Sequence, residues 1–416
     1  MIKRQWIAAS LFAPMLASCG GADDPPPTPS VPLCAQQIDY GTAFFGGSGS
    51  GELVKVQLDT TKLTYRITYL ASPVPATTGT VSPTRDTTPN NVLSGTLTDE
   101  TALPTQKLNQ CTFRLNAASL DPARPARLFL GKGVLGGTIP GATIQFDGVI
   151  GVGQIPKTTF PYYPFISFSQ LETDPSKIAG SYNQLGYHQV PSQRFASVPV
   201  DQSMTIHADG SYVETDNLGI KNGGVPLASS ATVNQKFVLR VDAPVFQSLN
   251  YQPQIPATLV SVAPIKAGRA ILIVGKLHNQ LVPVFIRTGS ANADLTQGAP
   301  FSDDESGISI LSPRNAIAPG SQDGEYTGVD SQFDYRATAL VGAQATLLDP
   351  FHASQAGLAL ALDLDFTQQV PGLVTSRHAD APGPSTGKFV FTGGVFGFLD
   401  TSIAGNPYFT IGAFVQ

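Results

Sequence analysis

Five histidines are the first candidates for chemistry, because imidazole is a common catalytic base and metal ligand. They are His188, His207, His278, His352 and His378. Two of them begin a His-x-Asp pattern, His207-Ala208-Asp209 and His378-Ala379-Asp380, whose side chains would share one face of a strand and could bind a metal together. Asp209 precedes a glycine, however, and Asp380 lies among prolines and glycines, so we predict turns at both places. No metal or other cofactor is expected.

Serine or carboxylate chemistry has three candidate segments. Gly46-Gly47-Ser48-Gly49-Ser50 resembles the nucleophile elbow G-x-S-x-G, but its fifth residue is serine and no helix is predicted after it, so we interpret it as a flexible loop. Asp303-Asp304-Glu305, or Asp363 with Asp365, could supply the two carboxylates of a glycosidase. The first cluster could also bind Ca²⁺, although a solvated turn is the preferred interpretation. No catalytic residue is assigned.

Cys19 follows a segment with the three parts of a bacterial export signal. Lys3 and Arg4 form a positive region, residues 7–16 form an apolar run, and Leu16-Ala17-Ser18-Cys19 resembles the lipobox. The apolar run is about half the roughly 20 residues that a membrane-spanning helix needs. We therefore predict a lipoprotein signal peptide over residues 1–18 and lipidation of Cys19, which anchors the protein to a membrane. The alternatives are an ordinary cleaved signal peptide and a transmembrane anchor.

Residues 19–33 predict a semi-rigid tether, because they are rich in proline and favour the polyproline II conformation. Gly20 follows the lipidated cysteine, whereas aspartate at that position is the signal that retains lipoproteins at the inner membrane. We therefore expect the protein in the cell envelope, at the outer membrane. In that oxidising compartment we predict a disulfide between Cys34 and Cys111, with two buried thiols as the alternative.

The composition favours an all-β fold. Charged residues make up 13% of the chain, below the roughly 25% of typical globular domains, and 41 glycines and 34 prolines indicate many turns. The formal net charge is −5 and no basic patch is evident, so nucleic acid is not an expected partner.

Alternating apolar and polar residues predict strands at 54–58 and 63–69, joined by a turn at 59–62. With weaker signals further along, these strands define an N-terminal β domain over residues 34–157. Residues 158–165 are aromatic and contain Pro161 and Pro164, which argue against a regular helix or a central strand. We interpret 158–165 as a linker packed between two domains, with an exposed aromatic patch that binds a sugar or a partner as the alternative.

We predict that residues 166–416 form a second domain. Asp209-Gly210 predicts a hairpin, and the alternation from Leu358 to Phe366 predicts a strand with one leucine face. A meander of eight or more strands tends to close, because closure removes exposed edges. The predicted fold class is all-β with two β-rich domains, the C-terminal one an antiparallel meander closed into a barrel, lipocalin-like at most.

Two motifs in this region carry a family resemblance, together with the lipobox and the tether. They are Ile178-Ala179-Gly180-Ser181-Tyr182 and Ile206-His207-Ala208-Asp209-Gly210-Ser211-Tyr212. The chain resembles a family of betaproteobacterial lipoproteins described only as a domain of unknown function. The resemblance covers most of the chain after Cys19 and implies no activity or site residues. Gly324-Glu325-Tyr326 repeats the Gly-x-Tyr of residues 180–182, but three residues are too few to establish an internal repeat.

Together these features predict a lipid-anchored envelope lipoprotein whose role is non-catalytic binding or scaffolding. Its expected partners are the membrane, through the anchor, and either a small apolar ligand or an envelope protein. A hydrolase acting on an envelope polysaccharide or on peptidoglycan is the alternative. A His–carboxylate pair in a cleft would favour that alternative, and an apolar barrel cavity of roughly a few hundred Å³ would favour ligand carriage.

Overall fold

The computed structural model describes residues 37–103, 106–116, 120–149, 153–216, 221–222, 225–226, 235–249, 251, 265–266, 268–290, 301–352, 359–379, 385–403 and 405–414. The fold is all-β, as predicted, with one short helix, α1 (Gln106–Gln110). Three groups of eight strands account for most of these residues, so the chain holds one barrel more than the sequence predicts. None of the described helices is long and apolar enough to cross a membrane.

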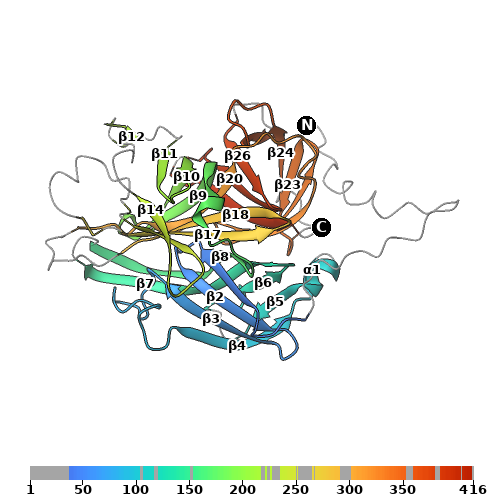
Figure 1. Cartoon of the computed structure of the whole chain (residues 1–416). Helices are drawn as coiled ribbons and strands as arrows, with labels where there is room; N and C mark the ends of the chain where they lie inside the picture. The colour runs from blue at the N-terminus through green and yellow to red at the C-terminus, as the bar shows by residue number, and fades with distance from the viewer. Residues whose placement is uncertain are drawn as a thin grey trace, which may run out of the picture.

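The first group is a closed antiparallel barrel in chain order (Figure 1). Its strands are β1 (Ala43–Ser48), β2 (Leu53–Asp59), β3 (Thr64–Ala71), β4 (Val92–Asp99), β5 (Thr112–Leu115), β6 (Arg127–Leu130), β7 (Val134–Val149) and β8 (Gly153–Phe168). The predicted turn between β2 and β3 is confirmed, and Asp59 Oδ1 stabilises it by accepting a hydrogen bond from Lys62 N (2.8 Å). Strand β8 closes the barrel by pairing with both β7 and β1.

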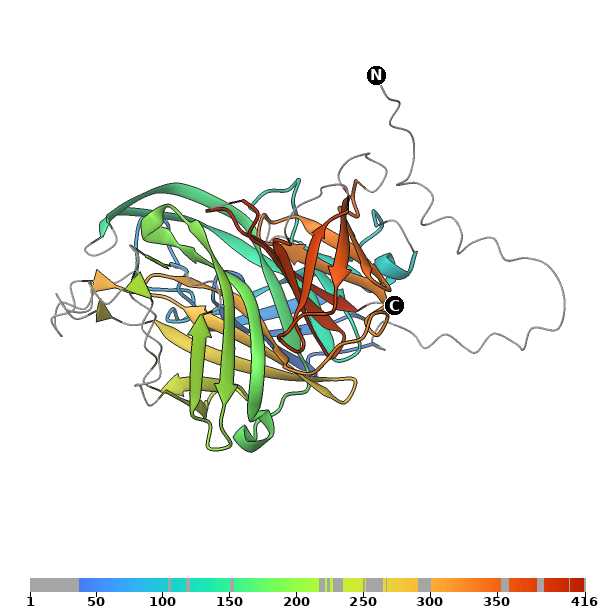
Figure 2. The same cartoon turned by 90° about the horizontal axis from the view of Figure 1, so that it is seen from above.

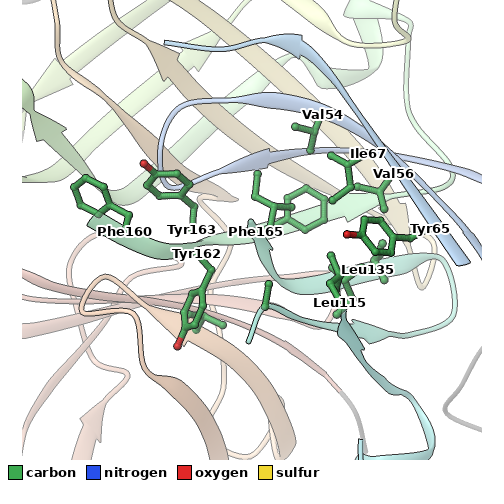
Figure 3. Close-up of a cluster of buried hydrophobic side chains, with 14 of the residues drawn as sticks. Val54, Val56, Tyr65, Ile67, Leu115, Leu135, Phe160, Tyr162, Tyr163 and Phe165 are labelled. Carbon is green, nitrogen blue, oxygen red and sulfur yellow. The ribbon is translucent and has the colours of Figure 1, made fainter. Parts of the chain in front are cut away.

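The prediction of a linker at 158–165 is wrong, since these residues form the middle of β8, and so is the domain boundary at 157. Strand β8 pairs with β1 only from Phe165 onward, so its earlier part is an edge, where the missing N–H of a proline is tolerated. Pro161 lies between the registered pairs Pro140–Tyr162 and Ala142–Phe160. The aromatic side chains are buried and form no exposed patch; Figure 3 shows Tyr162 and Tyr163 on opposite sides of the strand.

The second group, called the middle sheet below, has the order β11-β10-β9-β20-β18-β17-β15-β14. Its strands are β9 (Gly180–Val190), β10 (Ala196–Ile206), β11 (Tyr212–Asp216), β14 (Lys236–Leu239), β15 (Phe246–Leu249), β17 (Arg269–Leu277), β18 (Gln280–Thr288) and β20 (Ser306–Pro313). The predicted Asp209-Gly210 hairpin joins β10 to β11. The two outer strands approach each other through Tyr212 N–Gln235 O (3.2 Å) and Phe237 N–Gly210 O (2.9 Å), so the sheet is nearly closed. Two short pairs accompany it, namely β12 (Lys221–Asn222) with β13 (Val225–Pro226) and β16 (Ile265–Lys266) with β19 (Phe301–Ser302).

The third group is again a closed antiparallel barrel in chain order. Its strands are β21 (Gly324–Asp330), β22 (Tyr335–Val341), β23 (Gln344–Leu348), β24 (Leu360–Asp365), β25 (Val374–His378), β26 (Gly387–Thr392), β27 (Val395–Asp400) and β28 (Tyr408–Phe414). The predicted leucine face of β24 is confirmed by Leu362 and Leu364, which are buried in the barrel core. The Gly-x-Tyr motifs open β9 and β21, and in both the tyrosine hydroxyl donates to a carbonyl four residues earlier (Tyr182 to Ile178, 2.7 Å; Tyr326 to Gln322, 2.8 Å).

The middle sheet is covered on its outer face by both barrels. A shared apolar core joins Phe168 of the first barrel, Ile273 and Ile308 of the middle sheet, and Val395 and Ile411 of the third barrel. Strand β17 is therefore buried on both faces, which explains its uninterrupted apolar run, Ala270–Val274. Figures 1 and 2 show the middle sheet, green to yellow, beside the third barrel and over the first.

Candidate functional site

A small cavity lies where the first barrel meets the middle sheet, and its volume is about 40 Å³. Its wall consists of Ser50, Pro73, Val74, Pro75, Ile144, Phe146, Phe160, Tyr163, Gln189, Pro191, Phe195, Asp304 and Ser306. Since one water needs roughly 10–15 Å³ on this scale, the cavity has room for about three to four water-sized groups.

Strand alternation positions the polar side of the cavity. Ser306 begins β20 and lies opposite Gln189 of β9, and both residues line the cavity. Successive side chains of an extended segment point to opposite faces, so Asp304 shares the cavity side with Ser306, whereas Asp303 and Glu305 face the other way. Asp304 is buried, at 7% exposure, and accepts hydrogen bonds from Ser192 N (2.5 Å) and Ser192 Oγ (3.0 Å). Burial raises the pKa of Asp304, and the two hydrogen bonds partly oppose that rise.

On the opposite side of this segment an ionic cluster surrounds Arg287. Its guanidinium contacts Asp303 at 2.5 Å and Glu305 at 2.8 Å, and Glu305 also contacts His188 Nδ1 at 2.6 Å. Burial opposes the ionisation of Glu305, but Arg287 and His188 outweigh it and hold the pKa of this carboxyl at about 2. The predicted solvated turn at 303–305 is therefore wrong, because both faces of the segment are enclosed by protein.

His188 and Glu305 form the kind of pair that would favour a hydrolase. With Glu305 ionised, Nδ1 is the donor, which leaves Nε2 to act as the base toward a nucleophile. Nε2 is buried and has no hydrogen-bond partner among the described residues. A catalytic dyad needs a hydroxyl or thiol in contact with the base. Instead, Glu305 of this pair compensates the buried charge on Arg287.

The Gly46–Ser50 segment is not the predicted flexible loop, since Gly46–Ser48 form the end of strand β1 and Gly49 and Ser50 begin the buried turn that follows it. A Cβ atom at Gly49 would lie 2.1 Å from the Tyr187 hydroxyl, so the glycine is needed for close packing against the middle sheet. Ser48 and Ser50 contact each other (2.6 Å), and Ser50 donates to the buried carboxylate of Glu52 (2.8 Å). No described histidine hydrogen-bonds to either serine, and the turn is structural.

Glu52 links this turn to a buried arginine. Arg85 donates to Glu52 (3.4 Å) and to Pro140 O (3.2 Å), and its guanidinium lies over the ring of Tyr69 at 5.0 Å. The hydroxyl of Tyr163, a cavity residue, is buried beside this group and has no hydrogen-bond partner among the described residues.

An unusual backbone conformation shapes the aromatic wall. Arg194 and Phe195 both have positive φ (55° and 59°), in the turn between β9 and β10. Bulky residues rarely adopt this conformation, and such strain is found at binding sites more often than elsewhere. Here the turn places the Phe195 ring 4.9 Å from that of Phe160, edge to face.

The histidines considered from the sequence are not brought together. His207 is exposed in its hairpin, as the predicted turn requires, and Asp209 binds the backbone of Ser211 (3.0 Å). His378 lies 3.6 Å from Asp400, and its sequence neighbour Asp380 is outside the described residues. Within the described part of the chain no group of three His, Cys, Asp or Glu side chains could hold a metal ion.

The remaining predicted residues stay untested. Cys19 and Cys34 lie outside the described residues, as do the signal peptide and the tether. Cys111 lies between α1 and β5. Its disulfide with Cys34 remains a prediction, because Cys34 lies outside the described residues. Of the two carboxylates on β24, Asp363 is 3.5 Å from Arg377, and Asp365 accepts a hydrogen bond from Thr367 N (2.8 Å).

Comparison with known proteins gives a family and no activity. A family model described as "Protein of unknown function (DUF2957)" matches residues 64–413. No curated protein matches the chain. One similar solved structure is "The Structure of Intact Ap-TbpB (N and C lobes)", with 9% identity, a TM-score of 0.21, and coverage of 92% of this chain and 77% of that chain. Because the family model spans most of the sequence, this chain belongs to the DUF2957 family of proteins of unknown function.

Proposed function

We propose that this protein is a non-catalytic binding lipoprotein of the cell envelope, anchored through Cys19, that holds a small ligand group in the cavity between its first barrel and its middle sheet. One observation carries the proposal. The cavity has mostly apolar walls with a few converging polar groups, and it lies between two structural units, as binding sites commonly do.

We place the site between the first barrel and the middle sheet, because large side chains occupy the described interior of each of the three units. Side chains such as Tyr65 in the first barrel, Phe237 in the middle sheet and Phe389 in the third barrel are fully buried in the respective cores. The ligand group is therefore small, and the expected carriage of a larger apolar molecule inside a barrel is not part of the proposal. A hydrolase has less support, because His188 Nε2 contacts no nucleophile among the described residues.

The position of the cavity suits a protein on a tether. The chain reaches the first barrel at Ile38, whose backbone pairs with Thr60 next to the turn between β2 and β3. The cavity lies near the other end of β2, beside Ser50. The seven residues of β2 separate these ends by about 23 Å. An anchor on Cys19 would thus hold the barrel by the end away from the cavity.

Native mass spectrometry of the full chain, extracted from its membrane in detergent, tests this proposal. We expect an added mass that is lost on denaturation. Val74→Phe fills the cavity from a buried wall position and should remove the added mass, while Val341→Phe, at a position 60% exposed on the third barrel, should retain it. Ile144→Phe is a second cavity-filling variant should Val74→Phe not fold. An added mass that survives in the cavity variants, or none in the wild type, would contradict the proposal.

A further inference from the structure

We infer that the cavity takes an organic ammonium group, carried either by a free small molecule or by a lipid headgroup. The inference rests on the proposed function and specifies its ligand. It stands on four features of the cavity: its aromatic wall, an uncompensated carboxylate, an unpartnered hydroxyl and its size.

Four aromatic rings line the cavity, those of Phe146, Phe160, Tyr163 and Phe195. Phe160 meets Phe195 at an interplanar angle of 73° and meets Tyr163 at 32°, with centroids 4.9 and 5.4 Å apart. Rings set at different angles form a corner, and a cation is attracted to ring faces at up to about 6 Å. Within the described chain arginines cover other rings, including Tyr69, and no lysine or arginine lies over any of these four.

Asp304 supplies a negative charge without a cation of its own. The nearby guanidinium of Arg287 is engaged by Asp303 and Glu305, and none of the ion pairs found among the described residues includes Asp304. A buried carboxylate that is compensated only by neutral donors is less favourable than one that faces a cation, because its charge is not balanced. A ligand cation in the cavity would restore that compensation.

The surrounding charges add to this preference. The ionic groups near the cavity include the buried carboxylates of Glu52, Asp303 and Asp304, the partly buried carboxylate of Glu305, and the guanidinium groups of Arg85 and Arg287. Four negative and two positive charges leave a net charge of −2, which favours a cation and disfavours an anion in a partly enclosed site.

The buried hydroxyl of Tyr163 and the cavity volume restrict the ligand further. The hydroxyl lacks a partner in the described structure and can accept from an ammonium N–H or from a hydroxyl of the ligand. The space of about 40 Å³ accommodates about three to four water-sized groups, close to the four heavy atoms of a trimethylammonium group. The cavity volume therefore matches an ammonium headgroup and is too small to enclose a cyclic or aromatic cation.

Calorimetric titration of the full chain, in a detergent without an ammonium group, tests the inference with three probes. Choline is the free cation, 3,3-dimethylbutan-1-ol is its neutral isostere, and glycerophosphocholine represents the lipid headgroup. We expect choline to bind at least tenfold more tightly than the isostere. Asp304→Asn should reduce this preference to less than about threefold, while Asp363→Asn on the third barrel should retain it. Tighter binding of glycerophosphocholine than of choline would assign the ligand to a lipid, and the reverse to a free cation.

If Asp304→Asn binds the isostere with wild-type affinity, the variant is folded. Tyr163→Phe is the second variant, and we expect it to weaken choline binding several-fold. Equal affinity of the wild type for choline and its isostere would overturn the ammonium inference and leave the cavity as a ligand site. An added mass that Val74→Phe removes, together with no binding of any probe, would have the same meaning. Absence of both the added mass and probe binding would overturn the proposed function as well.

Discussion

Glu214 provides a sharp test of the electrostatics of the middle sheet. It lies on β11 with 5% exposure, and burial raises its pKa from 4.5 to about 7, with Arg287 acting in the opposite direction. Because the folded pKa lies above the unfolded one, the carboxyl contributes stability that is complete below pH 4.5 and is lost as the pH rises through 7. A shift of about 2.5 units corresponds to about 3 kcal/mol of unfolding free energy.

The perturbation is Glu214→Gln, which keeps the volume and cannot ionise. We expect the free energy of unfolding of the variant, relative to the wild type, to rise by about 3 kcal/mol between pH 4.5 and pH values above 8. Urea denaturation of the full chain, followed by circular dichroism at several pH values, measures this difference. Parallel pH profiles for the two proteins would show that Glu214 does not titrate as a buried acid and would contradict the prediction.

Three further predictions follow from the same structure. Glu305→Gln should have the opposite pH dependence. Because the pKa of Glu305 is about 2, its carboxylate contributes stability that is present above pH 4.5 and is lost as the pH falls through 2. In the same denaturation assay the variant should be less stable than the wild type by about 3 kcal/mol at pH 7 and nearly equal to it near pH 2. Gly49→Ala should destabilise the protein by about 1–3 kcal/mol and lower the denaturation midpoint, because the new methyl group meets the buried Tyr187 hydroxyl. Gly41→Ala should cost little, because at this exposed position the methyl group meets only the side-chain carboxylate of Asp39, which can move. Cys19→Ala should move the protein from the membrane to the soluble fraction and abolish incorporation of labelled fatty acid, and an unchanged distribution would argue for another anchor.

Local sequence patterns were sufficient to predict the strands that have one buried face and one more exposed face. The alternation in β2 and β24 and the Asp209-Gly210 turn depend on the pleat and on backbone preference, which act over a few residues. Strand β8 could not be predicted in this way, because Pro161 is tolerated only where the neighbouring strand ends. That condition depends on pairing with β1, more than 100 residues earlier in the sequence.

The candidate site was missed for a related reason. Asp303-Asp304-Glu305 has the composition of a solvated turn, and only the surrounding strands turn its alternating side chains into one ionic cluster and one isolated carboxylate. The glycines near Ser48 indicate flexibility in the sequence but serve close packing in the fold. The period of two in Asp303-Asp304-Glu305-Ser306 was the available signal for the site, and it becomes informative once both faces are known to be buried.

The most direct test of the central claim, that the cavity between the first barrel and the middle sheet binds a ligand group, is native mass spectrometry of the membrane-extracted full chain beside its Val74→Phe and Val341→Phe variants. We expect one added mass that is present in the wild type and in Val341→Phe and absent from Val74→Phe. An added mass that is equal in all three proteins, or missing from all three, would contradict it.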